Sequence, residues 1–74
     1  MIVLTLRQLR ESRSYSLTEV AAFCHVSASA VSAWERGIND PRPHQVRALA
    51  DFFKVTVSEI QEALKESAAK KDGD

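Results

Sequence analysis

The residue types that most often carry out chemistry are sparse in this chain of 74 residues. Its single cysteine, Cys24, stands beside His25, and the second histidine, His44, is distant in sequence, which is not the spacing of a zinc site. No serine has a plausible histidine and aspartate set, and no glycine-rich loop is present to hold phosphate. We therefore expect no metal, no cofactor and no enzymatic activity, and we expect Cys24 to be a small buried residue.

Arginine is the residue type whose distribution points to a partner. The ten basic and ten acidic side chains give a formal net charge of zero, which by itself argues against nucleic acid. The charge is uneven, however: up to Arg47 six arginines face four acidic residues, and from Ala48 onward four lysines face six acidic residues. All the arginine thus lies in the first part of the chain. There, the planar guanidinium suits phosphate and guanine better than the lysine ammonium does.

The stretch 16–37 is the core around which the rest of the chain is organised. Ser16 with Glu19 three residues later is a capping box, which begins a helix. Ser27 begins a second helical pattern, and Gly37 stands where a left-handed residue would end it. Two helices this short cannot bury an apolar face alone, and the connector between them is too short to let them separate. The pattern therefore predicts a helix-turn-helix.

The rest of the chain supplies three more helices. Before the core of 16–37 we expect a helix from about Leu4 to Arg13. After it we expect a loop over 37–43, a helix that begins at Pro43, and a helix begun by a capping box of Thr56 and Glu59. Within the core, the two helices should run from Ser16 to Cys24 or His25 and from Ala28 to Arg36. The predicted buried positions of the last two helices are Val46, Leu49, Ala50 and Phe53, then Val57, Ile60 and Leu64.

These patterns predict an all-α fold, a five-helix bundle, over residues 1–69, with 56–69 as a candidate dimerisation helix. The segment 70–74 has no apolar anchor, so we expect a disordered tail. No apolar run is long enough to span a membrane, and the apolar start of the chain lacks a basic flank. One cysteine cannot form an internal disulfide, which fits the cytoplasm.

The segments LRQLRESR, SLTEVA, VSASAVSAWERG and VRALADFFKVTVSEI follow one another in a fixed order, with a proline loop before the last. This order resembles the helix-turn-helix domain of the phage repressor and Cro type, also called the XRE family. The resemblance covers Leu6 to Ile60 and implies a lambda-repressor-like DNA-binding domain of prokaryotic or phage origin. In such a domain the helix 28–36 lies in the major groove and the helix before it crosses the DNA backbone.

The resemblance also assigns structural residues. It implies that Arg10 forms an ion pair with Glu35, which joins the first helix to the end of the third. The spacing of Trp34 from Val31 places both side chains on the inner face of their helix. Gly37 is at the one turn where the residue has no Cβ atom to restrict a left-handed backbone. At three other turns, where the family usually has glycine, this chain has Ser14, His25 and Lys54, so strained left-handed residues are expected there.

On the resemblance, base edges are read by Ala28, Ser29, Ser32 and Ala33, whose short side chains offer no bidentate fork. Readout must then use thymine methyl groups, single hydrogen bonds and DNA shape. The backbone N–H groups at the start of the second helix would meet phosphate, and Leu17 stands where a glutamine commonly does so. Two arginines of the set also have alternative roles that involve no DNA. Arg36 would offset the negative end of the helix dipole at the C-terminus of its helix, and Arg42 would be a solvated loop residue. The full predicted DNA-binding set is Ser16, Leu17, Thr18, Ser27, Ala28, Ser29, Ser32, Ala33, Arg36, Asn39 and Arg42.

The function that these patterns indicate is a sequence-specific transcription regulator, a small repressor that binds an inverted-repeat operator as a homodimer. The predicted dimer interface contains Phe52, Ile60 and Leu64. The alternative is a protein interaction module of antitoxin or repressor-partner type, in which Leu17, Ala28 and Ala33 form a mild apolar patch. A narrower alternative is a regulatory protein partner that covers the third helix.

Overall fold

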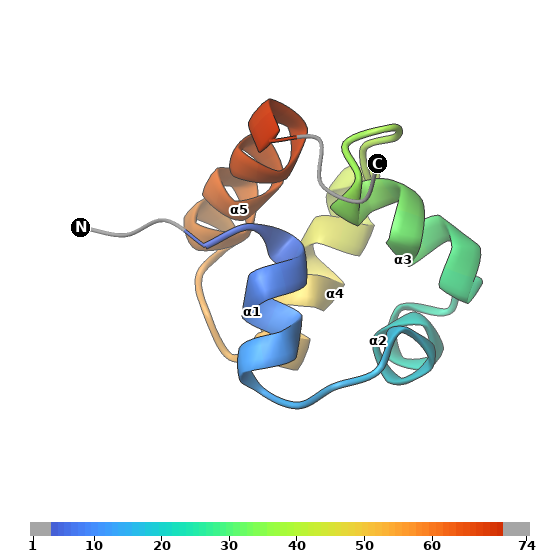
Figure 1. Cartoon of the computed structure of the whole chain (residues 1–74). Coiled ribbons are helices and arrows are strands. Elements are labelled where there is room, and N and C mark those ends of the chain that lie inside the picture. The colour runs from blue at the N-terminus through green and yellow to red at the C-terminus, as the bar shows by residue number, and fades with distance from the viewer. Residues whose placement is uncertain (1–3, 71–74) are drawn as a thin grey trace.

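Five helices make up the regular structure. The computed structural model describes residues 4–70, and within that range there is no strand. Figure 1 shows α5 and the α2–α3 pair on opposite sides of the molecule, with α1 and α4 between them. The prediction of an all-α, five-helix fold is confirmed. The helices are α1 (Leu6–Ser12), α2 (Leu17–Cys24), α3 (Ala28–Glu35), α4 (Pro43–Phe53) and α5 (Val57–Lys70).

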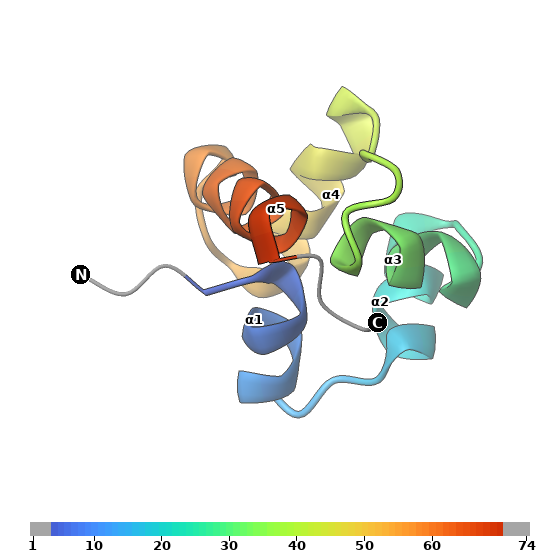
Figure 2. The ribbon, with the colours of Figure 1, turned by 45° about the horizontal axis from the view of Figure 1, so that its top comes forward.

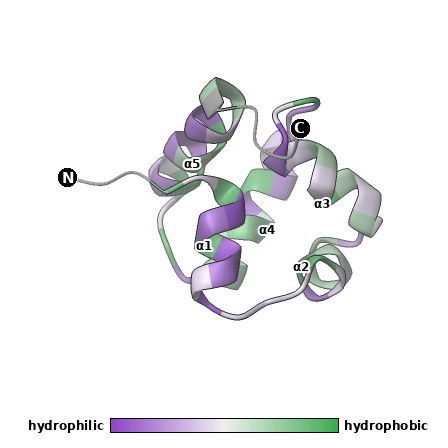
Figure 3. Cartoon of the chain, viewed as in Figure 1, coloured by the Kyte–Doolittle hydropathy of each residue, from purple (hydrophilic) through white to green (hydrophobic). Residues whose placement is uncertain are grey.

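The core lies where these helices meet (Figure 2). α5 contacts α1, α3 and α4, and α2 contacts α3 and α4, so no helix buries its apolar side alone. In Figure 3, α1 and α5 each carry both strongly hydrophilic and strongly hydrophobic residues. By contrast, α3 is mostly pale, because its residues are near neutral in hydropathy. The apolar side chains with the least exposure are Leu6, Val20, Val31, Leu49, Phe53 and Ile60.

Capping boxes begin α2 and α5, as the sequence predicts. The Ser16 hydroxyl oxygen accepts from the Glu19 N–H at 3.1 Å, and the Glu19 carboxylate accepts from the Ser16 N–H at 2.8 Å. Thr56 and Glu59 form the same reciprocal pair at 3.1 Å and 2.8 Å. Each box satisfies two backbone donors that the first turn of a helix leaves free, so the boundaries of both helices are fixed locally.

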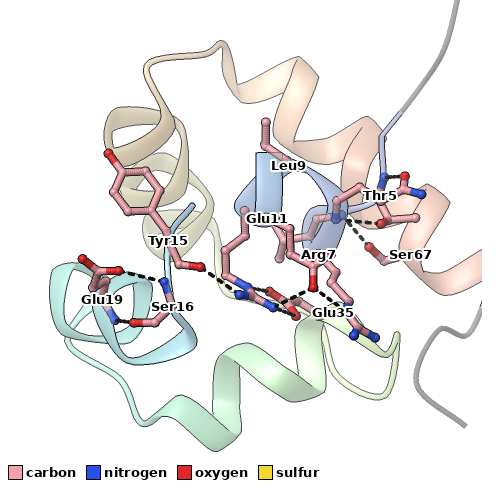
Figure 4. A network of polar contacts seen from close by, with 12 residues as sticks. Thr5, Arg7, Leu9, Glu11, Tyr15, Ser16, Glu19, Glu35 and Ser67 are labelled. Carbon is pink, nitrogen blue, oxygen red and sulfur yellow. Dashed lines mark hydrogen bonds and ion pairs between the residues drawn. The ribbon is translucent and has the colours of Figure 1, made fainter. Parts of the chain in front are cut away.

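α1 begins at Leu6, two residues later than predicted, because Thr5 is its N-cap. The Thr5 hydroxyl oxygen accepts from the Gln8 N–H at 3.1 Å, and Gln8 Oε1 accepts from the Thr5 N–H at 3.0 Å. The buried Ser67 hydroxyl accepts from the Leu6 N–H and donates to the Ala63 carbonyl, both at 2.9 Å (Figure 4). The start of α1 is therefore tied to the second half of α5.

All four expected turn residues have left-handed backbone geometry. The φ angles are 63° at Ser14, 59° at His25, 59° at Lys54 and 74° at Gly37. A residue with a Cβ atom loses roughly 1–2 kcal/mol in this conformation, so the three non-glycine turns hold strain that the packed helices must offset.

α5 differs from its predicted pattern at both ends and in the middle. Val57, predicted to be buried, is 38% exposed because it is the first residue of the helix. In the middle, Ile60 has no exposed surface, which confirms its predicted burial but removes it from the predicted dimer interface. Lys70 is still helical, one residue into the predicted tail. The remainder of that tail, 71–74, lies outside the described residues.

Candidate nucleic-acid interface

Three residues join α2 to α3 and turn the chain sharply. His25 is left-handed, and the Val26 N–H donates to the Ala21 carbonyl at 3.0 Å, which folds the connector back onto α2. Ser27 then caps α3, its hydroxyl oxygen accepting from the Ala30 N–H at 3.1 Å. The two helices are packed against each other, and their relative position is set by hydrogen bonds at the turn and by the core beneath.

A buried ion pair fixes the C-terminal end of α3. Arg10 Nε lies 2.6 Å from Glu35 Oε2 and Arg10 Nη2 lies 3.2 Å from Glu35 Oε1, a bidentate arrangement with side chains only 12% and 6% exposed. Arg10 Nη1 also donates to the Tyr15 carbonyl at 2.9 Å (Figure 4). One guanidinium thus connects α1, the loop after it and α3. The pair that the resemblance implied is present.

The end of α3 is also shaped by Gly37. The Gly37 N–H donates to the Trp34 carbonyl at 3.2 Å and the Ile38 N–H donates to the Ala33 carbonyl at 3.0 Å, the two bonds of a Schellman motif. A Cβ atom at Gly37 would lie 2.7 Å from the Cα atom of Ala68. Glycine is therefore required both by the positive φ angle and by the close approach of α5. Trp34 is buried, as predicted.

The outward side of α3 carries short polar side chains. Ser29 is exposed, and Ser32 and Ala28 are half-buried. Ala33 was predicted to read bases, but it is only 9% exposed and belongs to the buried side of α3 with Val31 and Trp34. Ala33 is therefore removed from the candidate set. A serine hydroxyl donates and accepts single hydrogen bonds, and the Ala28 methyl group offers an apolar contact.

The start of α2 offers free backbone donors. The capping box uses the N–H groups of Ser16 and Glu19, and no hydrogen bond among residues 4–70 uses those of Leu17 and Thr18. These two N–H groups are at the positive end of the helix dipole, where a phosphate is favoured. Ser16 and Thr18 are exposed, whereas the Leu17 side chain is half-buried against the core, so Leu17 offers its backbone rather than its side chain.

Three arginines, which we call the α1 arginines, have protein partners. They are Arg7, Arg10 and Arg13. Arg7 Nε lies 3.1 Å from the Glu11 carboxylate on the same helix. Arg10 holds the end of α3, as described above. Arg13 Nη1 donates to the Phe53 carbonyl at the end of α4, at 2.6 Å. Arg10 and Arg13 therefore connect elements of the fold, and Arg7 has a partner within its own helix.

The other three arginines, which we call the open arginines, are exposed. They are Arg36, Arg42 and Arg47. Their side chains make no hydrogen bond or ion pair with any residue in the range 4–70. Asn39, in the loop between Arg36 and Arg42, is also exposed. The sequence analysis missed Arg47 as a candidate contact, although the apolar spacing of α4 already placed it on the polar side of that helix.

The predicted dimer residues do not lie together. Phe52 is part of an aromatic cluster, with ring centroids 4.5 Å from Tyr15, 5.1 Å from Phe23 and 5.1 Å from Phe53. Leu64 is half-buried on α5 and lines a groove that Phe52 does not touch. With Ile60 in the core, the sequence pattern does not describe a continuous interface.

The remaining candidate chemistry concerns metal ligands and the single thiol. Residues 4–70 contain no group of three histidine, cysteine, aspartate or glutamate side chains that could hold a metal ion. Cys24 is buried, and burial raises the pKa of its thiol, which disfavours the reactive thiolate. In the same range, no helix combines the length and the apolar character needed to cross a membrane.

Comparison with known proteins agrees with this geometry. A family profile described as a helix-turn-helix domain matches residues 2–63. The HTH-type transcriptional activator BcrR of Enterococcus faecalis is 33% identical over 55 residues, which are 74% of this chain and 27% of the relative. The chain thus spans about a quarter of the length of that protein. No solved structure matches the chain.

Proposed function

Since the chain belongs to the helix-turn-helix domain family, we propose that it is a DNA-binding transcription regulator that lays α3 in the major groove of double-stranded DNA. The observation that carries this proposal is the outward side of α3. Ser29 and Ser32 stand on a helix that the Arg10–Glu35 pair holds in place, and an open arginine, Arg36, follows at its end. A rigid helix with a polar face and an unpartnered cation is suited to a polyanion.

Base readout is proposed to come from three residues of α3. Ser29 and Ser32 supply single hydrogen bonds to base edges, and the Ala28 methyl group contacts a thymine methyl. None of these side chains forms the bidentate pair that is worth about 1–3 kcal/mol of discrimination. Specificity must therefore depend partly on the shape and deformability of the DNA.

The DNA backbone is proposed to bind around α3. At the start of α2 lie the free N–H groups of Leu17 and Thr18, with the exposed hydroxyl groups of Ser16 and Thr18 beside them. The Ser16 and Ser27 hydroxyl oxygens accept capping bonds, but each hydroxyl hydrogen remains available to donate to phosphate. The open arginines and Asn39, which are exposed at the end of α3, in the loop after it and on α4, supply the remaining proposed contacts.

We propose that the regulator acts as a homodimer on an inverted repeat. One short helix reads only a few bases, so two copies on half-sites about 34 Å apart would supply the missing affinity. The domain measures 28 × 26 × 24 Å, so each copy would cover most of one turn of the duplex. Occupation of that length is sufficient to block another protein, and we therefore propose repression, with a promoter fusion deciding between repression and activation.

Selection of binding sites from a random duplex library at low salt tests this function. We expect enrichment of an inverted repeat, and an affinity for it that falls steeply with ionic strength as counterions are released. A matched control is Arg7→Ala, which removes an exposed arginine that already has a partner in α1. It should leave the salt dependence unchanged.

The contrary result is weak binding with a flat salt dependence and no enriched sequence. That result would contradict DNA reading and would favour the interaction module, in which a protein partner covers α3.

A further inference from the structure

Ile38, in the loop that follows α3, is the most exposed large apolar side chain between residues 4 and 70, with an exposed fraction of 61%. Phe23, the next at 47%, packs on Phe52 with ring centroids 5.1 Å apart. The Schellman motif at the end of α3 commonly packs an apolar side chain at the position of Ile38 onto the residue five positions earlier. That residue is the already buried Ala33, whose single methyl group can cover little of an isoleucine. The local fold therefore leaves most of Ile38 uncovered.

One part of the loop after α3 lies toward α5. Pro41 is buried, and with Asp40 it lines one wall of a groove of about 450 Å³. The other wall of this groove belongs to α5 and includes Leu64 and Lys65. Asp40 is the one acidic residue of the loop, and its carboxylate would repel phosphate. Because Asp40 is on the α5 side, this repulsion is kept away from the free part of the loop.

The free part of the loop carries the residue types that bind a DNA minor groove. Ile38, Asn39 and Arg42 are exposed and do not line the groove beside α5. Arg36, also an open arginine, precedes them at the end of α3. Proteins that bind the minor groove use arginine and asparagine, among others, to read it, and they often insert isoleucine or a similar apolar side chain between two base pairs. The stretch 36–42 combines these types and continues directly from the helix proposed to read the major groove.

We propose that Ile38 inserts between two base pairs of the minor groove that adjoins the major groove holding α3, and that it kinks the duplex there. The inference rests on the proposed DNA-binding function and names the class of DNA selected. That class is a duplex with a pyrimidine–purine step, such as TA or CA, at a fixed distance from the bases under α3. Such steps are easily unstacked, so they cost little to open. Arg36 and Arg42 bind phosphates at the rim and hold the loop against the groove.

The insertion supplies specificity that α3 lacks. Ala28, Ser29 and Ser32 form no bidentate pair with a base edge. A side chain that must open a base step makes the affinity depend on how readily that step deforms, although no base edge is recognised there. The contact is also apolar. The affinity lost on its removal should therefore be the same at every salt concentration, unlike the loss from an open arginine.

Two variants at one position, Ile38→Ser and Ile38→Met, test the insertion. Serine cannot fill an opened step, whereas methionine is itself a side chain that inserts. Because burial of an isoleucine is worth about tenfold or more in affinity, Ile38→Ser should weaken binding to a half-site duplex with the step by that factor. Its salt slope and thermal midpoint should be those of the wild type, and Ile38→Met should bind like the wild type. Val57→Ser is the matched control, because Val57 is 38% exposed on α5, across the molecule from α3 (Figure 1). It should not change DNA affinity.

The opened step can be observed in the DNA itself. Aminopurine is an adenine analogue that is dim when stacked and bright when unstacked, and it replaces the adenine of the step. The wild type and Ile38→Met should brighten it, and Ile38→Ser should not. Selection from the random library should enrich the step with the wild type and not with Ile38→Ser. Replacement of the step by a stiff AA step should weaken the wild type about tenfold and leave Ile38→Ser unchanged.

Three results would overturn the insertion and leave DNA binding by α3 standing. The first is that Ile38→Ser binds the half-site as tightly as the wild type. The second is that the wild type binds without brightening the analogue at any position beside the half-site. The third is a loss in Ile38→Ser on the full inverted repeat alone, which would make Ile38 a contact between subunits. A wild type that binds no duplex would instead refute the proposed function, and the insertion with it.

Discussion

The α1 arginines and the open arginines have the same side chain and opposite roles. In the first group the guanidinium hydrogens are directed to protein acceptors: Arg10 and Arg13 reach a carboxylate and a carbonyl of other elements, and Arg7 reaches the Glu11 carboxylate on its own helix. In the second group, Arg36, Arg42 and Arg47 have no protein acceptor within residues 4–70. A cation count alone therefore overstates the charge that is available to DNA. Availability depends on which arginines the fold already uses.

The largest expected effect is the loss of stability when Arg10 is replaced by alanine. Glu35 would remain buried without its partner, which costs about 3–5 kcal/mol. For a domain of this size that corresponds to a fall in Tm of more than about 10 °C, measurable by circular dichroism. A loss below about 1 kcal/mol would contradict the assignment of Arg10 to the fold.

The paired replacement Arg10→Met with Glu35→Leu serves as the control for that variant. It removes both charges and keeps the apolar volume, so most of the lost stability should return.

The next effect concerns the open arginines and should appear in DNA affinity alone. By counterion release each phosphate contact is worth about tenfold in affinity near 0.1 M salt. Arg36→Ala combined with Arg42→Ala should therefore weaken binding by about a hundredfold and reduce the magnitude of the salt slope by about 2. Because both side chains are exposed, the free energy of unfolding should change by less than about 0.5 kcal/mol. Unchanged affinity would mean that these arginines do not meet phosphate.

A smaller effect is expected for Arg13→Ala. The variant loses the charged hydrogen bond to the Phe53 carbonyl, and a bond of this kind contributes about 1.5 kcal/mol. Urea unfolding should show that loss, and the affinity for half-site DNA at a temperature where the variant is folded should not change. A drop in affinity with no change in stability would place Arg13 among the open arginines.

The smallest effect is a pH dependence at the start of α5. The Thr56 backbone N–H, then its hydroxyl group, lower the pKa of Glu59, and the charge of Arg13 adds to this. Because the folded pKa lies below the unfolded one, this stabilisation is present above the unfolded pKa and is lost as the pH falls through the folded pKa. Unfolding measured across acidic pH should show that slope in the wild type and less of it in Glu59→Gln. Arg13→Ala should raise the pKa of Glu59, and Arg36→Ala should not.

The features that could be predicted from the sequence are those set by neighbouring residues. Local residue types were enough to predict the capping boxes at Ser16 and Thr56, the cap at Ser27 and the left-handed backbone of Gly37. Each of these features involves residues only a few positions apart. Thr5 was missed because the apolar residue before it made the helix seem to begin earlier. The Arg10–Glu35 pair came from the family resemblance, since 25 positions separate its members.

The features that could not be predicted depend on how distant segments meet. Ala33 lies on a helix whose exposed side is decided by the neighbouring elements, and it proved to be buried; the burial of Ile60 was predicted, but its place in a dimer interface was not compatible with that burial. Ser67 is a lone serine near alanines, and only the packed structure shows that it joins α1 to α5. The groove beside Lys65 forms between a loop and a helix some 25 positions later, which no periodic pattern reveals. The contacts to DNA remain predictions.

The most direct test of the account is a titration of isotope-labelled protein with the selected duplex, followed by amide chemical shifts. We predict that the largest changes occur at the start of α2, along the outward side of α3 and in the loop with Arg42. The amides around Arg10 and Arg13 should change little. Changes centred on the aromatic cluster of Phe23 and Phe52, with α3 unaffected, would contradict the claim that α3 reads DNA.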